Sequence, residues 1–91
     1  MYDTIIELRV RNHPGVMSHI TGLFSRRAFN LEGIICGPVG DGTQSRMILL
    51  VNKNHRLDQM IKQLEKLYDV LAVSIREDPD RVHYPWVYGQ G

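Results

Sequence analysis

The residues best placed to do chemistry form a short turn, Asn12-His13-Pro14-Gly15, just before an amphipathic segment. Backbone N–H groups at a helix start are unpaired and lie at the positive end of the helix dipole, so they attract a carboxylate. Gly15 lets a ligand approach the backbone, and the Asn12 amide can donate and accept hydrogen bonds. An amino acid would fit, with its carboxylate on N–H groups near Val16 and its ammonium on a carbonyl or asparagine oxygen. The same residues also make a good turn and cap, so both interpretations stay open.

Other groupings of reactive side chains give weaker signals. The four histidines show no metal-binding spacing, and no Ser-His-Asp or Cys-His arrangement can be argued. Cys36 lies in an apolar segment and is expected to be a core or interface residue. Glu65 and Asp69 lie four residues apart at a predicted helix end, where we expect both to be solvated. The Arg26-Arg27 pair is either a solvated polar surface or a contact with a partner.

The composition narrows the class of protein. A chain of 91 residues with 43% hydrophobic content has room for one domain with a thin core. Its 11 basic and 10 acidic residues leave a net charge of +1, without the concentrated cationic surface that nucleic-acid binding needs. No apolar run is long enough for a membrane span, and the first residues lack a signal-peptide pattern. With a single cysteine, the chain is expected to be cytoplasmic.

Hydrophobic periodicity predicts six elements in the order strand, helix, strand, strand, helix, strand. Period-two and apolar runs predict the four strands Thr4–Val10, Leu31–Val39, Ser45–Val51 and Val70–Ile75. The first helix is expected to present an apolar face made of Val16, Met17, Ile20, Leu23, Phe24 and Ala28. It should end at Asn30 in a left-handed conformation. The second helix should begin after an Asn54 N-cap and carry its apolar residues from Leu57 to Tyr68.

This order predicts an α+β fold of the ferredoxin-like βαββαβ type. Right-handed crossovers place both helices on one face of a four-stranded antiparallel sheet with strand order 4-1-3-2. The segment Leu31–Val39 then lies at an edge, with Glu32 as its one charge and Pro38 only near its end. Such an edge is either covered by a loop or the tail, or it pairs with a second copy. We favour pairing, because a small domain gains missing core that way.

The run Asn12–Ile34 resembles the ACT domain family, in the form found in small regulatory subunits of acetohydroxyacid (acetolactate) synthase. The motif positions are met by Val10, Asn12, Pro14, Gly15, Val16, Met17, Ile20, Gly22, Leu23, Phe24, Arg26, Arg27, Phe29, Asn30, Leu31, Gly33 and Ile34. The segment Asp58–Val73 also resembles the family, so the likeness covers about residues 4–76. We therefore expect an ACT domain over residues 1–76 and a C-terminal tail over residues 77–91.

The resemblance implies a non-catalytic regulatory subunit. It would bind a branched-chain amino acid, usually valine, at a homodimer interface and regulate a separate catalytic subunit. Thiamine diphosphate, magnesium and FAD are expected in that catalytic subunit and none of them in this chain. The implied effector contacts are Asn12, His13, Pro14, Gly15, Val16 and Met17 of one protomer, facing Asn30, Leu31 and Ile34 of the other. The implied dimer interface is Leu31, Glu32, Gly33, Ile34, Ile35 and Cys36.

Several alternatives remain beside this interpretation. The chain could be a free-standing ACT-type amino-acid sensor that serves a different enzyme. An RNA-binding domain of the same architecture needs aromatic residues on its first and third strands, where TIIELRV and SRMILLV contain none. Many members of the family have a second domain, so this chain resembles the short, single-domain type. The tail, with its aromatic residues Tyr84, Trp86 and Tyr88, is either a docking peptide, a segment folded back on the domain, or disordered.

Overall fold

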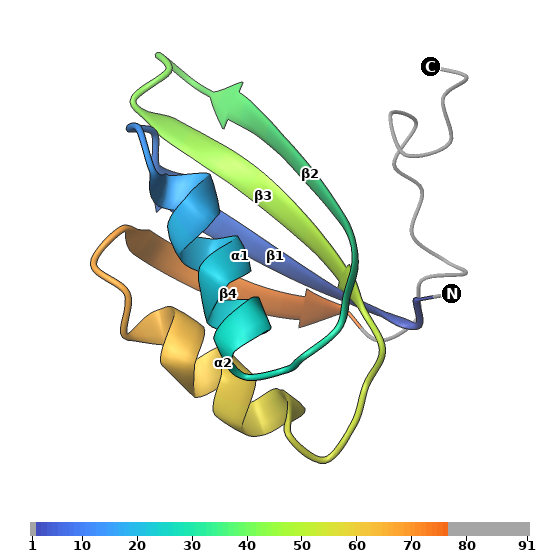
Figure 1. Cartoon of the computed structure of the whole chain (residues 1–91). Helices are drawn as coiled ribbons and strands as arrows, with labels where there is room; N and C mark the ends of the chain where they lie inside the picture. The colour runs from blue at the N-terminus through green and yellow to red at the C-terminus, as the bar shows by residue number, and fades with distance from the viewer. Residues whose placement is uncertain (1, 77–91) are drawn as a thin grey trace.

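The computed structural model describes residues 2–76, and Figure 1 shows the arrangement of its six elements. In chain order these are β1 (Thr4–Arg11), α1 (Val16–Arg26), β2 (Leu31–Val39), β3 (Gln44–Val51), α2 (Leu57–Glu65) and β4 (Val70–Arg76). The predicted order of strands and helices is confirmed. The expected tail, with its three aromatic residues, lies outside the described residues.

The four strands form one antiparallel sheet in the order β2-β3-β1-β4, as predicted, and both helices cover the same face (Figure 1). This confirms the βαββαβ fold of the ACT type. The strands β2 and β4 are the two edges of the sheet. Both β1 and β2 run antiparallel to β3, so they run parallel to each other and start at the same end of the sheet.

The main core lies between the sheet and the two helices. Alternate residues of β1 point into it, as the period-two pattern predicts, and α1 and α2 contribute their apolar stripes. The fully buried members are Ile6, Leu8, Val10, Ile20, Phe24, Met47, Leu49, Val51, Met60 and Leu64. Burying each such side chain stabilises the fold by roughly 1.5–3 kcal/mol. On the other face of the sheet, Ile5, Ile48 and Leu50 form a second buried cluster, so β1 is also buried on this face at Ile5.

Three residues expected on apolar helix faces are exposed, and those expectations are wrong. Met17 is 39% exposed, because Val16 and Ile20 already fill the stripe and Met17 lies at its margin. Tyr68 is 79% exposed, and its ring lies under the Arg11 guanidinium, 4.5 Å from ring centroid to Cζ. Ala28 lies beyond the end of α1 and is exposed.

Both predicted helix boundaries also need correction. The helix α1 ends at Arg26, and the left-handed residue that follows is Ala28, with φ 52°, instead of Asn30. The chain turns early because Phe29 is buried against Phe24, and the Phe29 N–H donates to the Phe24 carbonyl at 2.9 Å. The N-cap of α2 is Arg56 and not Asn54. The Asn54 side chain instead accepts from the Arg56 N–H at 2.7 Å and shapes the preceding turn.

Within residues 2–76, neither helix combines the length and apolar character that crossing a bilayer requires. The expected cytoplasmic location therefore stays a prediction.

Candidate functional site

The turn before α1 leaves the start of the helix open. Gly15 is the N-cap and has φ 90°, a conformation that favours glycine. No side chain within residues 2–76 caps α1, and the first turn of the helix contains no acidic residue. A Cβ placed on Gly15 would meet no atom within 4 Å, so space remains in front of the turn. The Val16 N–H already donates to the His13 carbonyl at 3.4 Å, so the N–H groups that follow it in the first turn are the ones that can receive a carboxylate from a ligand.

Asn12 is held by the hairpin between β2 and β3. Its backbone N–H donates to the Thr43 carbonyl at 3.0 Å, and its Nδ2 donates to the Gly42 carbonyl at 2.8 Å. The side-chain amide is thus fixed in one orientation, and its Oδ1 is the atom left to accept from a ligand ammonium. Asn12 thus connects the turn before α1 to the hairpin that follows the Val39 end of the edge strand β2.

His13 is held by Asp69, which lies directly before β4. The His13 Nε2 lies 2.5 Å from Asp69 Oδ1, and the His13 Nδ1 lies 2.9 Å from the Pro14 carbonyl. The Asp69 side chain is 10% exposed, and its Oδ2 lies 4.0 Å from Nδ1 of His19 on α1. The expectation that Asp69 is solvated is therefore wrong. No local pattern in the sequence indicates this contact, because 56 residues separate its two partners.

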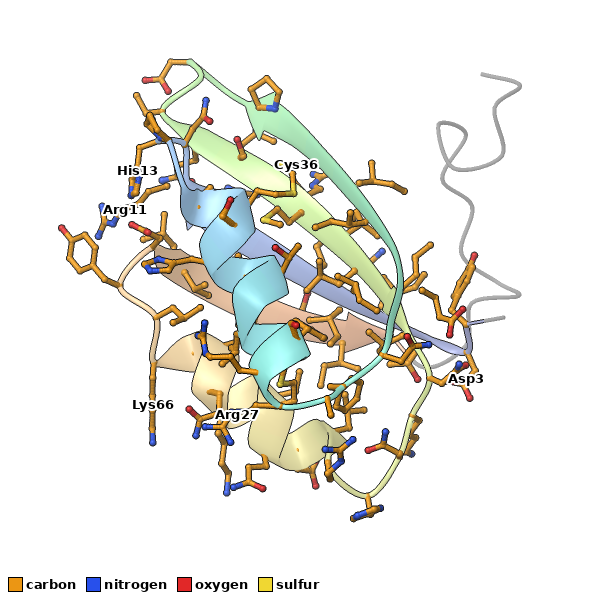
Figure 2. The ribbon with its side chains drawn as sticks, in the orientation of Figure 1. Asp3, Arg11, His13, Arg27, Cys36 and Lys66 are labelled. Atoms are coloured by element: carbon orange, nitrogen blue, oxygen red, sulfur yellow. The ribbon has the colours of Figure 1, made fainter. Side chains whose placement is uncertain are left out.

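The hydrogen bond to the Pro14 carbonyl, and then the one to the Asp69 carboxylate, raise the pKa of His13 above its ordinary value. Both acceptors favour the protonated ring, whereas partial burial and the nearby Arg11 oppose it. Arg11 is also tied to this end of the sheet, since its backbone N–H donates to the Asp69 carbonyl at 2.9 Å. Figure 2 shows His13 and Arg11 together at that end.

The second group of expected effector residues lies at the other end of the sheet. Leu31 pairs with Val51, which in turn pairs with Thr4 at the start of β1. The Asn12 turn follows the last residue of β1. Asn30 donates from Nδ2 to the Glu32 carboxylate, which also accepts from Asn52 at 3.2 Å. One chain therefore does not bring the two groups of residues together.

The expected interface residues of β2 divide between three environments. Leu31 and Ile34 pack against the main core, and Ile35 packs against the cluster on the opposite face. Glu32 is exposed at a register shift between Leu31 and Gly33. Gly33 lies close to Leu50, since a Cβ there would approach Leu50 Cδ1 to 3.1 Å.

Cys36 is exposed within one chain, so it is not a core residue, and its expected alternative role in an interface stays a prediction. Beside it, Ile35 and residues 36–39 of β2 border an apolar hollow of about 330 Å³, completed by Arg46 and Ile48 of β3. Within residues 2–76, no group of three or more histidine, cysteine, aspartate or glutamate side chains is arranged to hold a metal ion.

Comparisons with known proteins identify a family. The model of the AHAS small subunit-like ACT domain matches residues 6–72. The small subunit of acetolactate synthase isozyme 1 from Escherichia coli strain K12 is 59% identical over 72 residues, which are 79% of this chain and 75% of that protein. The small subunit of isozyme 3 from the same strain is 44% identical over 71 residues, which are 77% of this chain but only 44% of that protein.

Solved structures agree with the sequence relatives. A crystal structure of the acetolactate synthase small subunit from Thermotoga maritima superimposes with a TM-score of 0.71 at 33% identity. The superposition covers 79% of this chain and 45% of that one.

Proposed function

This chain belongs to the AHAS small subunit-like ACT domain family, the small regulatory, non-catalytic subunits of acetolactate synthase, and we propose that it binds a branched-chain amino acid between two copies of itself. Valine is the effector we expect, and its binding would exert feedback control on a separate large catalytic subunit. The observation that carries the proposal is the uncapped start of α1 at Gly15, which offers backbone N–H groups and open space to a carboxylate.

The need for two copies follows from the direction of the strands. The Asn12 turn and the Asn30–Ile34 segment lie at opposite ends of one sheet. If two β2 edges pair antiparallel about a two-fold axis, the partner's Leu31 end lies against the Val39 end of the first chain. That end adjoins the hairpin to which Asn12 is bonded. Each of two equivalent pockets would then take its polar turn from one chain and its apolar wall from the other.

Most of the expected residues have a role in this pocket. The N–H groups that follow Gly15 bind the carboxylate, while Oδ1 of Asn12 accepts from the ammonium. Met17, which is exposed in one chain, contacts the aliphatic side chain of the effector together with Leu31 and Ile34 of the partner copy. His13 and Pro14 hold the turn in shape.

A ligand that bridges two chains binds the dimer better in one relative orientation of the protomers than in others. A large subunit that contacts the dimer differently in these orientations is then activated or inhibited. In this scheme the large subunit binds thiamine diphosphate, magnesium and FAD. The complex of the two subunits is cytoplasmic in this proposal. The alternative is a free-standing ACT-type sensor for a different enzyme, which the resemblance to acetolactate synthase small subunits makes the weaker proposal.

Calorimetric titration of valine, leucine and isoleucine tests the proposal, with glycine as the control for the side chain. We expect about one ligand for each chain, with glycine bound far more weakly, because it lacks the apolar group. The titration is repeated with the large subunit of the same organism present. The absence of binding at millimolar ligand in both settings would contradict the effector assignment. Failure of the two subunits to co-purify would instead favour the free-standing sensor.

A further inference from the structure

A cationic groove lies at the other end of α1, between that helix and α2. Its volume is about 540 Å³, which is in the range of sites that hold small ligands or a few residues of a peptide. The residues that line it, here called the arginine groove, are Leu23, Arg26, Arg27, Phe29, Arg56, Gln59, Met60, Gln63 and Leu67. They come from the last turn of α1, the segment after it, and α2 with the residues that flank it.

The arginine groove contains three guanidinium groups and no carboxylate. Arg26 and Arg27 are neighbours in sequence, and the fold adds Arg56 from the start of α2. Within residues 2–76, no carboxylate forms an ion pair with any of the three. In a chain whose net charge is only +1, this is a local concentration of unneutralised positive charge. Like charges gathered in this way repel one another unless an anion joins them.

Two of the guanidinium groups are positioned by the fold. Arg56 donates to the Arg27 carbonyl at 2.7 Å and to the Ala28 carbonyl at 2.9 Å. Its Cζ also lies 5.8 Å from the centre of the Phe29 ring. On α1, the guanidinium of Arg26 lies over Gly22, where an added Cβ would come within 3.2 Å of its Nη1. Gly22 therefore leaves room for Arg26 to lie along the helix surface.

The remaining lining residues indicate what kind of ligand fits. Leu23, Phe29 and Met60 are buried and form an apolar floor. The amides of Gln59 and Gln63 lie beside it and can hydrogen-bond to a peptide backbone. An apolar floor with amides and arginines around it suits a chain segment that has both apolar and acidic side chains. A small inorganic anion would leave the apolar floor unused.

We propose that the arginine groove docks an acidic, amphipathic segment of the acetolactate synthase large subunit. This rests on the proposed function for the identity of the partner. Carboxylates of the segment pair with Arg26 and Arg27, whose side chains are exposed and make no ion pair within the described residues. Arg56 keeps its bonds to the end of α1 and gives shape to the groove.

The chain offers a closely matched pair of variants for the test. Arg26 is the basic residue in the last turn of α1 and Arg27 is its C-cap, while Lys62 is the basic residue in the last turn of α2 and Lys66 is the C-cap of that helix. The lysines do not line the groove. Figure 2 shows Lys66 at the C-terminal end of α2. Arg26→Glu/Arg27→Glu and Lys62→Glu/Lys66→Glu therefore change the net charge and the helix ends alike, but only the first alters the groove.

The affinity of the full chain for the purified large subunit of the same organism is measured for the unmodified chain and both double variants. Thermal unfolding confirms that each variant is folded. We expect Arg26→Glu/Arg27→Glu to weaken the complex at least about tenfold and to reduce its salt dependence. The lysine variant should stay within about threefold of the unmodified chain.

Each other outcome has a distinct meaning. If both double variants bind as the unmodified chain does, the groove proposal is wrong and the proposed function stands. If both weaken equally, net charge and not the groove determines affinity, which also overturns the proposal. If the unmodified chain does not bind the large subunit, the proposed function fails and the groove loses its partner.

Discussion

The two ends of α1 both suit negative charge, but they do so by different means. At the N-terminal end, Gly15 has no side chain and the charge is met by backbone N–H groups and the helix dipole. At the C-terminal end, Arg26, Arg27 and Arg56 supply full positive charges around a larger hollow. The first end suits one small carboxylate in a fixed position. The second suits a protein segment whose charges need not occupy such precise positions.

The two ends of α1 are also held in place by different contacts. The N-terminal turn is fixed by contacts from distant segments, namely Gly42 of the hairpin and Asp69 before β4. The C-terminal end is fixed by Arg56 alone among the described side chains that donate to it. Because α1 is one helix of 11 residues, roughly 16 Å long, a shift at one end is carried to the other. This gives a physical route between the proposed effector site and the proposed docking groove.

The largest expected effect concerns Gly15 in the turn before α1. Gly15→Asp should weaken effector binding at least about a hundredfold, because a second carboxylate would then compete for the same N–H groups. Gly15→Ala is the control, since it brings the same strain at φ 90° without the charge. Calorimetry of both variants separates the two causes. Equal losses of affinity would show that backbone strain, not occupation of the pocket, explains the effect.

The next effect concerns the two edges of the sheet. Cys36→Lys on β2 should shift the proposed dimer towards monomer by at least about tenfold in dissociation constant, because a lysine opposes edge pairing. Leu71→Lys on β4 is the control, since Leu71 is also exposed but lies on the opposite edge. Sedimentation analysis over a range of concentrations measures both. A dimer weakened by Leu71→Lys alone would place the interface on β4.

A smaller effect, on stability, is expected from the contacts that Arg56 makes with the C-terminal end of α1. Arg56→Ala should lower the free energy of unfolding by about 1–2 kcal/mol, since it removes two hydrogen bonds to helix-end carbonyls and the contact with Phe29. Arg27→Ala removes a nearby positive charge without those contacts and should cost at most about 0.5 kcal/mol. Urea unfolding of both variants measures the difference. Equal losses would mean that Arg56 acts only through its charge.

The smallest expected effect is on how the stability of the fold depends on pH. The pKa of His13 is raised in the folded chain, so the stability from its protonated ring is fully present below its ordinary pKa of 6.5 and is lost as pH rises through the raised value. Thermal unfolding between about pH 5.5 and pH 8.5 should show this decline. His13→Ala should abolish it. Asp69→Asn should remove only part of it, because the Pro14 carbonyl still favours the protonated ring.

The control for the pH series is His55→Ala, which removes an exposed histidine in the loop between β3 and α2. It should leave the decline unchanged. An identical pH profile for the unmodified chain and His13→Ala would show that the contact with Asp69 does not contribute to stability.

The sequence by itself determined the order of elements, the antiparallel sheet and the position of β2 at an edge. These follow from period-two and helical patterns, which record which side of each element is buried, and from the handedness of the crossovers. It also marked the Asn12–Gly15 turn, because proline, glycine and asparagine act on the backbone locally. The local patterns failed at Ala28, where the packing of Phe29 on Phe24 ends the helix early, and at Asp69, where a contact with the distant His13 replaced the local preference.

Only the tertiary structure decided which distant residues meet. It joined Asp69 to His13 across 56 residues, and it brought Arg56 to Arg27 across 29. It also separated Asn12 from Asn30, placing them at opposite ends of the sheet although both are marked by the same motif. The reason is that burial patterns describe one element at a time, whereas contacts between elements depend on register and on how helices pack against the sheet.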